Sequence, residues 1–370
     1  MSDEYIVRRH NQNNNSIERS FMIFPNTCLE SITAVLPENR ITSAAIEKWL
    51  APIYRRLRLP EGRLALMTGI DERRHWAPGT MPSQTAAQAG DKALRLADLA
   101  ADSIDALCNC SVSRDFVEPA TSTIVHRLLK LPGRTINFDI SNACLGFLSG
   151  MVVMAGLIES GQIQRGLLVA GENGRPLMEN TIQVLNQNTS LGRRDIKPMF
   201  ASLTIGSAAA AAVLCHRSVS RQHHRLLGGS HLCDTRYNHL CQGNADSGMN
   251  DQSRPLMSTD AEELLTQGVE VARNNWTLCK QTLGWDNQTP DLICTHQVGR
   301  MHRQRLYHEL ALAPDKDFAT VEFLGNCGSA SLPATLALAV EDKNKVRRGD
   351  RIALLGIGSG INCQMLGLQW

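Results

Sequence analysis

The stretch TPDLICTHQVGR, residues 289–300, repeats the pattern of an earlier stretch, SIDALCNCSVSR, residues 103–114. In both copies an apolar run leads into a polar end. A segment of helical pattern then follows, which closes in LKLP after the first copy and in LALAP after the second. A repeat of this kind indicates a chain built as two halves on one plan. We therefore predict a duplicated architecture.

The chain continues in the same order after each copy. A strand comes next, then a helix that starts in small residues, SNACLGF around Cys144 and GNCGSASLP around Asn326, and then a polar turn and a further strand. Strands that alternate with helices predict an α/β fold with parallel pairing. This order places Cys144, His296 and Asn326 at strand-to-helix junctions, where α/β sheets usually form their ligand clefts. The expected elements are helices over 43–57, 84–101, 122–131 and 144–160, and strands over 104–110, 135–140 and 166–170.

The repeat also suggests where the chain divides. The predicted regions are a mobile extension (1–20), an N-terminal half that carries Cys144 (21–218) and a C-terminal half that carries His296 and Asn326 (219–370). The segment 221–258 is rich in Gly, His, Asn and Ser, so we predict a long irregular excursion between the halves.

The composition excludes several classes of protein. With 43% hydrophobic and 20% charged residues over 370 positions, the chain has an ordinary globular composition. Its net charge of +2 comes from 38 basic and 36 acidic residues spread along the chain, which leaves no basic stripe for nucleic acid. The N-terminal residues lack the apolar stretch of a signal peptide, and apolar runs such as 205–214 are shorter than the roughly 20 residues that cross a bilayer. We expect neither nucleic-acid binding nor integral membrane association.

The cysteines point to a reducing compartment. There are 11 of them, scattered and odd in number, with no paired CxxC spacing and no Cys/His pattern of a metal site. Cys108 and Cys110 lie one residue apart, but no second pair completes a four-ligand site. We interpret all of them as reduced thiols of a cytoplasmic protein that holds no metal.

Three residues at the junctions could carry nucleophilic chemistry. A cysteine attacks as its thiolate, and Cys144, at the start of a predicted helix, meets the positive end of the helix dipole, which lowers the pKa of a thiol. His296 could donate a hydrogen bond to a developing oxyanion or, as imidazolium, stabilise the thiolate. Asn326 could supply a second fixed donor. Taken singly, a buried core thiol, a structural histidine and a capping asparagine are the commoner interpretations. What favours a catalytic site is that all three residues lie at corresponding strand-to-helix junctions of the two repeated halves.

Four motifs carry a resemblance to a known family. They are NACLGF at 142–147, THQV at 295–298, GNCGSASLP at 325–333 and GIGSGIN at 356–362. Together, in this order, they resemble a ketosynthase III type member of the thiolase superfamily over roughly residues 63–370. The resemblance implies the duplicated, five-layered αβαβα thiolase fold, normally found as a homodimer.

The resemblance also implies roles for the site residues. Cys144 takes an acyl group as a thioester, while His296 and Asn326 polarise the carbonyl of the second acyl group. Backbone amides of Cys144 and of the C-terminal glycine loop near Ser359 form an oxyanion hole. The substrates implied are acyl-CoA or acyl carrier protein thioesters, with no cofactor.

Glu118 bears on the type of reaction. Loss of carbon dioxide from a malonyl unit gives an enolate without a base, whereas α-proton removal from a fatty acyl thioester needs one. The segment CSVSRDFVEP, residues 110–119, resembles a loop of the OleA-type enzymes of olefin and β-lactone biosynthesis, in which the matching glutamate reaches across the dimer into the neighbouring site. A carboxylate that enters an apolar acyl tunnel has a raised pKa, which suits a base. On its own, a glutamate next to a proline is more often a solvated loop residue.

Three further stretches resemble OleA-type sequences: TGIDERRHW (68–76), YNHLCQGN (237–244) and RIALLGIGSGINC (351–363). One segment departs from the initiating ketosynthases, which carry a Gly-Asp-Gly-Ala-Gly type segment where this chain has TIGSA at 204–208. Arg73 and Arg74 could meet a substrate phosphate, but basic residues outside a site usually form a solvated face, so we assign them no role.

Three hypotheses follow. The first is a non-decarboxylative Claisen condensation of two fatty acyl-CoA thioesters through an acyl-enzyme on Cys144, with Glu118 donated across a homodimer as the base. The second is a decarboxylative 3-oxoacyl synthase III or pyrone-forming enzyme that uses a malonyl unit. The third is a non-catalytic partner subunit of the same fold. The sequence alone fixes neither the acyl chain length, nor CoA or carrier protein as donor, nor the pathway.

Overall fold

The computed structural model describes residues 21–243, 256–342 and 344–370. The predicted mobile extension over 1–20 lies outside these residues. The strands are β1 (Phe21–Ile23), β2 (Thr27–Val35), β3 (Asn39–Thr42), β4 (Glu72–His75), β5 (Ala106–Asn109), β6 (Ile136–Asp139), β7 (Arg165–Glu172), β8 (Ala208–His216), β9 (His224–Cys233), β10 (Cys241–Gly243), β11 (Met257–Thr259), β12 (Leu292–Thr295), β13 (Arg351–Gly358) and β14 (Asn362–Gln369). The helices are α1 (Ser43–Trp49), α2 (Ala51–Leu57), α3 (Arg63–Thr68), α4 (Pro82–Leu96), α5 (Thr121–Leu128), α6 (Gly146–Glu159), α7 (Arg175–Gln187), α8 (Arg193–Ile196), α9 (Ala261–Leu283), α10 (Arg300–Glu309), α11 (Val321–Leu324) and α12 (Ser331–Glu341).

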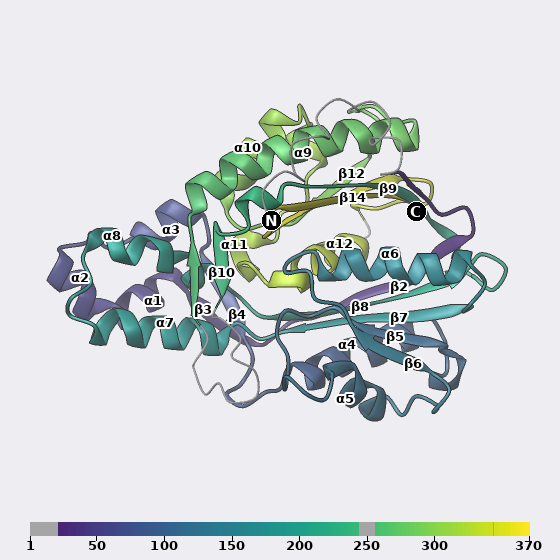
Figure 1. The fold of residues 1–370 in the computed structure, drawn as a ribbon, viewed down its shortest axis with the longest axis horizontal. Helices are drawn as coiled ribbons and strands as arrows, with labels where there is room; N and C mark the ends of the chain where they lie inside the picture. Colours follow the sequence, from purple (N-terminus) through teal and green to yellow (C-terminus); the bar gives the residue numbers. More distant parts are fainter. Residues whose placement is uncertain (1–20, 244–255, 343) are drawn as a thin grey trace, which may run out of the picture.

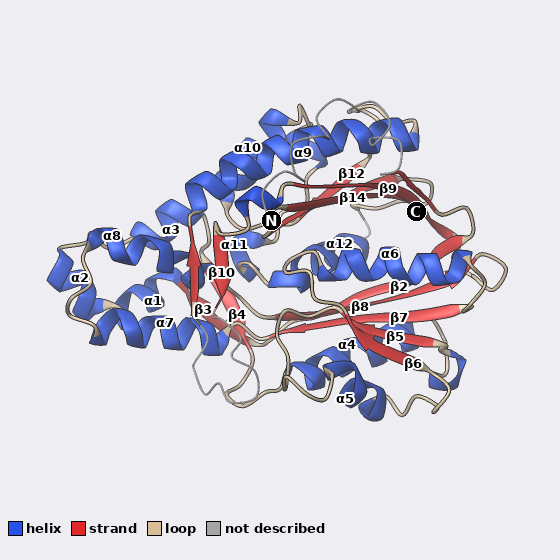
Figure 2. Cartoon of the chain, viewed as in Figure 1, coloured by secondary structure: helices blue, strands red, loops and turns tan. Residues whose placement is uncertain are grey.

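The architecture is layered. Strands of the described residues form one main sheet in the order β12-β13-β14-β9-β2-β8-β7-β5-β6, with β1 also paired to β9. This sheet folds over, so that α6 and α12 lie between its two halves (Figures 1 and 2). Helices α4 and α5 cover the outer face of one half, and α9 and α10 cover that of the other. The predicted five-layered order, helix, strand, helix, strand, helix, is therefore confirmed.

The two halves of the sheet repeat one pattern, as the sequence predicts. In the first, β5 runs parallel to β7, and β7 runs antiparallel to β8. In the second, β12 runs parallel to β13, and β13 antiparallel to β14. The pairing is thus mixed rather than wholly parallel. The position of the division, at residue 218, stays a prediction.

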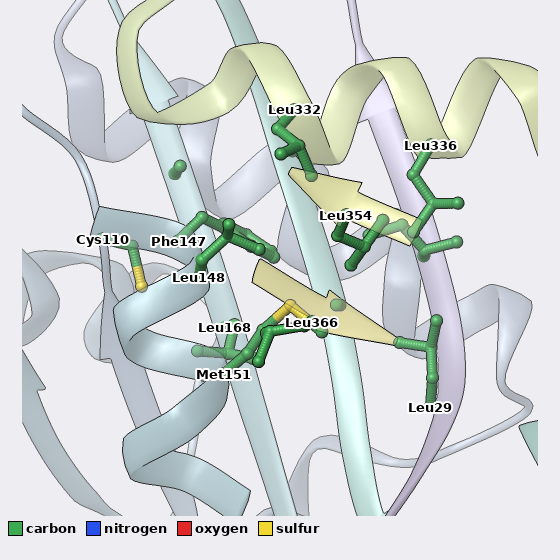
Figure 3. Close-up of a cluster of buried hydrophobic side chains, with 14 of the residues drawn as sticks. Leu29, Cys110, Phe147, Leu148, Met151, Leu168, Leu332, Leu336, Leu354 and Leu366 are labelled. Carbon is green, nitrogen blue, oxygen red and sulfur yellow. The ribbon is translucent and has the colours of Figure 1, made fainter. Parts of the chain in front are cut away.

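The central layer explains the apolar sequence of its two helices. A helix covered by a sheet on each side needs apolar residues all round instead of one apolar stripe. Helix α6, GFLSGMVVMAGLIE, meets this need, and so does α12, SLPATLALAVE. Figure 3 shows Leu148 and Met151 of α6 beside Leu332 and Leu336 of α12, together with buried side chains of the strands.

The two halves of the sheet meet along a short seam. Strand β2 pairs with β9 only through Cys28 with Arg225 and Leu29 with His224. By contrast, β2 pairs with β8 along nearly its whole length, from Thr27 to Val35. Most of the attachment between the halves therefore comes from side chains packed around α6 and α12.

The prediction of an irregular excursion over 221–258 is wrong for its first part. Strand β9 lies in the middle of the main sheet, between β2 and β14. Its glycines make the sequence look like a loop, but they serve the pairing. A Cβ atom at Gly228 would lie 2.0 Å from the Met22 carbonyl oxygen, and one at Gly229 would lie 1.9 Å from that of Met365. Residues 244–255 of the excursion lie outside the described residues.

Replacing Gly229 by alanine tests this packing. Because the new methyl group would overlap the backbone of β14, we expect Gly229→Ala to lower the free energy of unfolding by about 1–3 kcal/mol. Urea unfolding followed by circular dichroism measures the change. Gly156→Ala is the matched control, since no heavy atom lies within 4 Å of a Cβ at this exposed position in α6, and it should stabilise the protein by about 0.5–1 kcal/mol. Equal stability of the two variants would contradict the packing argument.

A helical lobe stands beside the layers and contains α1, α2, α3, α7 and α8 (Figure 1). The single helix predicted over 43–57 is two helices here, which break at Leu50 because Pro52 starts a new first turn. Among the helices of the described residues, none combines the length and the apolar run that crossing a bilayer requires.

Candidate active site

Cys144 lies in the turn between β6 and α6, two residues before the first residue of the helix. The Leu145 amide donates to the Asn142 carbonyl oxygen at 2.9 Å, and Ala143 has φ of +44°, a left-handed conformation that an alanine rarely adopts. The turn is tight because Gly146 packs directly against the backbone of Cys110: a Cβ atom there would lie 2.3 Å from the Cys110 carbonyl oxygen. Cys144 itself is half-buried.

The expected lowering of the Cys144 pKa is wrong. Burial, with smaller contributions from nearby Cys241 and Glu172, raises the pKa of this thiol to about 12. The dipole of α6 therefore does not offset the loss of water around the sulfur. At neutral pH the thiol is therefore protonated, so attack by its sulfur requires a group that accepts the proton.

Alkylation measures this thiol directly. Since the thiolate fraction rises about tenfold per pH unit below the pKa, we expect iodoacetamide to modify Cys144 with a rate that climbs steadily from about pH 7 to about pH 10. Peptide mass mapping of the modified protein gives the rate, with Cys144→Ala as the blank. A rate that levels off below about pH 8 would mean that the protein supplies a thiolate at rest.

His296 follows β12 directly, and its amide donates to the Leu355 carbonyl oxygen of β13 at 2.9 Å. The side chain is 3% exposed, and neither ring nitrogen has a hydrogen-bond partner among the described residues. Burial lowers the pKa of His296 to about 3, with a further contribution from His302. The ring is therefore neutral, which excludes the imidazolium role at rest and leaves one N–H donor and one acceptor nitrogen.

Asn326 lies in a tight turn that the segment 204–208 holds in place. Its amide donates to the Thr204 carbonyl oxygen at 2.9 Å, and its own carbonyl oxygen accepts from the Gly206 amide at 2.9 Å. The side-chain Oδ1 accepts the Gly328 amide at 3.0 Å. Because Oδ1 is engaged, the amide group is oriented and Nδ2 remains as a donor. Segment 204–208, which differs in sequence from that of the initiating ketosynthases, thus holds the Asn326 turn in place through backbone hydrogen bonds.

Further contacts bring the segments of the predicted site together. The Ser329 Oγ, three residues after Asn326, accepts the Phe147 amide in the first turn of α6 at 2.9 Å. Asn362 Nδ2 donates to the Ser359 carbonyl oxygen at 3.2 Å and to the Asn142 Oδ1 at 3.3 Å. The glycine loop of Ser359 therefore adjoins the turn of Cys144.

His296 is tied to the Asn326 turn through its neighbour. The Gln297 Oε1 accepts the amides of Thr320 and Val321 at 2.9 and 3.0 Å, at the start of α11, which leads into Asn326. Cys144, His296, Asn326 and Ser359 thus sit on adjoining segments that come from both halves of the sheet.

Glu118 differs from the other predicted residues because it is exposed. It lies near the tip of the loop between β5 and α5, after Phe116 and Val117, which are 53% and 51% exposed. Val112 at the start of the loop is 48% exposed. The chain therefore presents Glu118 to its surroundings on a loop that also exposes these three apolar side chains.

Some residues were missed or misjudged from the sequence. Glu172, the last residue of β7, is 4% exposed and accepts backbone amides near the site; a lone carboxylate that closes an apolar strand is the signal that could have revealed it. Arg73 does not lie on a solvated face: it is fully buried and donates to the Ser43 Oγ at 2.8 Å. Cys108 and Cys110 are buried with their sulfur atoms 3.6 Å apart.

Comparison with known proteins places the chain in a family. Residues 138–233 match the family model of 3-oxoacyl-[acyl-carrier-protein (ACP)] synthase III, and residues 280–370 match that of its C-terminal part. Among curated proteins, the chain is 37% identical to an acyl-CoA:acyl-CoA alkyltransferase of Shewanella oneidensis, over 94% of this chain and 100% of that protein. It is 34% identical to the enzyme of the same name from Xanthomonas campestris, over 94% and 100%.

A solved structure agrees with this placement. A Xanthomonas campestris OleA variant, crystallised with bound lauric acid and lauroyl-CoA, superposes with a TM-score of 0.88 at 34% identity, over 94% of this chain and 100% of that one. The chain belongs to the OleA type of the thiolase superfamily. It is accordingly a carbon–carbon bond-forming acyltransferase. The thiolase fold that its motifs predict is confirmed. The hypothesis of a non-catalytic partner is set aside.

Proposed function

We propose that this enzyme condenses two fatty acyl-CoA thioesters head to head, without decarboxylation, and yields a β-keto acid after hydrolysis of the product thioester. The observation that carries the proposal is a half-buried thiol on a segment that adjoins those of His296 and Asn326. Among the described residues, neither ring nitrogen of His296 has a hydrogen-bond partner, and the Asn326 Oδ1 is engaged, which leaves Nδ2 as a donor. The name of its relatives and the lauroyl-CoA held by the Xanthomonas OleA variant support the substrate class.

The first step acylates Cys144. The thiol is protonated at rest, so His296 takes its proton as the sulfur attacks the thioester carbonyl. Backbone amides of Cys144 and Ser359 donate to the oxyanion that forms on the acyl oxygen. CoA leaves as its thiol with the proton returned by His296, and the acyl group stays on the sulfur.

The second step forms the carbon–carbon bond. His296 and Asn326 Nδ2 donate to the carbonyl oxygen of the second acyl-CoA, which makes its α-hydrogen more acidic. Glu118 removes that proton, and the enolate attacks the Cys144 thioester. The Cys144–acyl bond breaks and the sulfur leaves as thiolate, which regains a proton from water as Glu118 gives up its own. The product is a β-ketoacyl-CoA with the second alkyl chain at its α-carbon. Water then cleaves the CoA thioester. No cofactor enters this sequence.

The base comes from the neighbouring subunit of a homodimer. Strand β6 is the edge of the main sheet and pairs with β5 alone among the described strands. The Ile136 side chain in β6 is 52% exposed, and the apolar side chains of the Glu118 loop are exposed to a similar extent. An open edge strand beside exposed apolar side chains favours burial against another chain. A second copy seated there would receive Glu118 together with the exposed apolar side chains of this surface.

We also place the enzyme in the cytoplasm, because all of its cysteines are free thiols and a reducing compartment keeps them so.

A decarboxylative synthase is the second candidate, since both matching family models describe a 3-oxoacyl carrier protein synthase. Incubation of the purified enzyme with one fatty acyl-CoA separates the two functions. The proposed reaction releases CoA and gives, after spontaneous loss of carbon dioxide, a ketone seen by gas chromatography with mass detection. Strict dependence on a malonyl carrier protein would refute the proposal and favour the second candidate.

A further inference from the structure

Glu172 connects two loops that come from different halves of the molecule. Its Oε1 accepts the Val112 amide at 2.7 Å and the Ser329 amide at 3.2 Å, while its Oε2 accepts the Ser113 amide at 3.0 Å. Val112 and Ser113 begin the loop of Glu118, and Ser329 follows Asn326 by three residues. One carboxylate thus joins the stems of both loops.

The loop of Glu118 is held at its base and free at its tip. Beyond the bonds to Glu172, the Ser113 Oγ accepts the Asn173 amide at 3.1 Å. The Asp115 carboxylate accepts the Ser83 amide at 2.9 Å and the Ser83 hydroxyl at 2.5 Å. Glu118 follows this fixed stem on an exposed tip. The direction in which Glu118 leaves the protomer therefore depends on the bonds at residues 112–115.

The turn of Asn326 is held from two sides. Asn326 Oδ1 accepts the Gly328 amide at 3.0 Å, and Glu172 accepts the next amide, that of Ser329. Gly328 packs so closely that a Cβ atom would lie 3.2 Å from the carboxylate carbon of Glu172. A shift of the carboxylate would therefore move the turn that orients the Asn326 amide.

The choice of a carboxylate at this place has a physical cost. A buried ionised group without a cation is unfavourable unless hydrogen bonds stabilise it, and no Lys, Arg or His of the described residues forms an ion pair with Glu172. Burial raises the pKa of Glu172, and the amides of Val112, Ser113 and Ser329 lower it. A neutral side chain would avoid this cost but would offer fewer acceptor positions to three amides.

We propose that Glu172 is a positioning residue that sets the places of Glu118 and Asn326 together. The inference rests on the proposed function, in which Glu118 serves the partner's site and Asn326 serves its own. One Glu172 therefore acts on two active sites of the dimer at once.

The first test compares two isosteric substitutions in the homodimer. Glu172→Gln keeps the shape but replaces one acceptor oxygen by an NH₂ group that faces a backbone N–H. A misplacement of about 1 Å is enough to cost about 100-fold in rate, so we expect condensation to fall by about that factor while acyl loading of Cys144, read by intact mass, changes little. Glu30→Gln is the matched control: Glu30 is also buried and accepts the Arg221 amide and the Ser220 hydroxyl, away from the loops of the site. Glu172→Asp, which keeps the charge on a shorter arm, serves if Glu172→Gln does not fold and should show the same separation.

The second test separates the two sites in mixed dimers. A dimer of one Cys144→Ala chain and one Glu118→Ala chain, purified through two different affinity tags, has one complete site: the Cys144 of the second chain with the Glu118 of the first. Glu172→Gln on the first chain then reports only on Glu118, and on the second chain only on Asn326. We expect both placements to lower condensation, whereas Glu30→Gln in either chain leaves it unchanged.

Each outcome decides between the explanations. No loss from either placement, or a loss from one placement alone, would overturn the joint role of Glu172. An inactive parent mixed dimer beside an active wild-type enzyme would instead refute the cross-subunit base of the proposed function, and this result is read before Glu172 is changed. A loss of acyl loading as large as the loss of condensation would show a merely structural effect and overturn the inference as well.

Discussion

Replacing Cys144 by alanine is expected to lower product formation from acyl-CoA by at least about 10⁴-fold, as removal of a nucleophile from a cooperating set does in other acyl-transfer enzymes. The other side chains of the site cannot form the thioester that the second acyl group attacks. The acyl-enzyme, seen as a mass increase of one acyl group on exposure to acyl-CoA, should vanish in Cys144→Ala. Release of CoA should stop with it.

The control for this change is Cys233→Ala, which removes an exposed thiol and should leave both readings as in the wild type. Full acyl loading of Cys144→Ala would place the nucleophile on another cysteine. One alternative is Cys241, which is close enough to Cys144 to raise its pKa.

Replacing Glu118 by alanine is expected to have the second largest effect, a loss of about 10²–10⁴-fold in condensation, the range that a general base contributes. Acyl loading of Cys144 should remain, because that step uses His296 rather than Glu118. The variant would thus accumulate as the acyl-enzyme, and mass spectrometry would show it stalled there. Exchange of the α-hydrogens of acyl-CoA in deuterated buffer should stop at the same time.

Glu38→Ala is a suitable companion, since Glu38 is also exposed but lies in the turn between β2 and β3. It should retain full activity. Condensation at the wild-type rate by Glu118→Ala would remove the case for proton abstraction and leave the decarboxylative reaction as the better account.

The sequence predicts a duplicated α/β fold because the repeat and the strand-to-helix junctions are local patterns, and the resemblance to the thiolase superfamily adds the layered order. The strand β7 and the helix α6 fall within two residues of the expected bounds. Strand β9 was not predicted, because its glycines are required by close contact with the backbones of neighbouring strands that are distant along the chain. Local pattern cannot report such close approach.

The candidate site shows the same division. The positions of Cys144, His296 and Asn326 follow from motifs. The protonation states of Cys144 and His296 instead follow from burial, which depends on the whole fold. The expected low pKa of Cys144 took account of the helix dipole and left out the loss of water, which is the larger effect. Glu172 was missed because its partners, Val112, Ser113 and Ser329, lie up to 157 positions away.

The short seam between β2 and β9 has a consequence for the chemistry. Cys144 belongs to one half of the sheet, and His296 to the other, yet few backbone hydrogen bonds fix the halves to each other. The distance between the two halves is instead set by the side chains of the interior helices α6 and α12, which are packed between them. Trimming a methionine or leucine from α6 or α12 would thus alter the distance between the sulfur and the imidazole without touching either group.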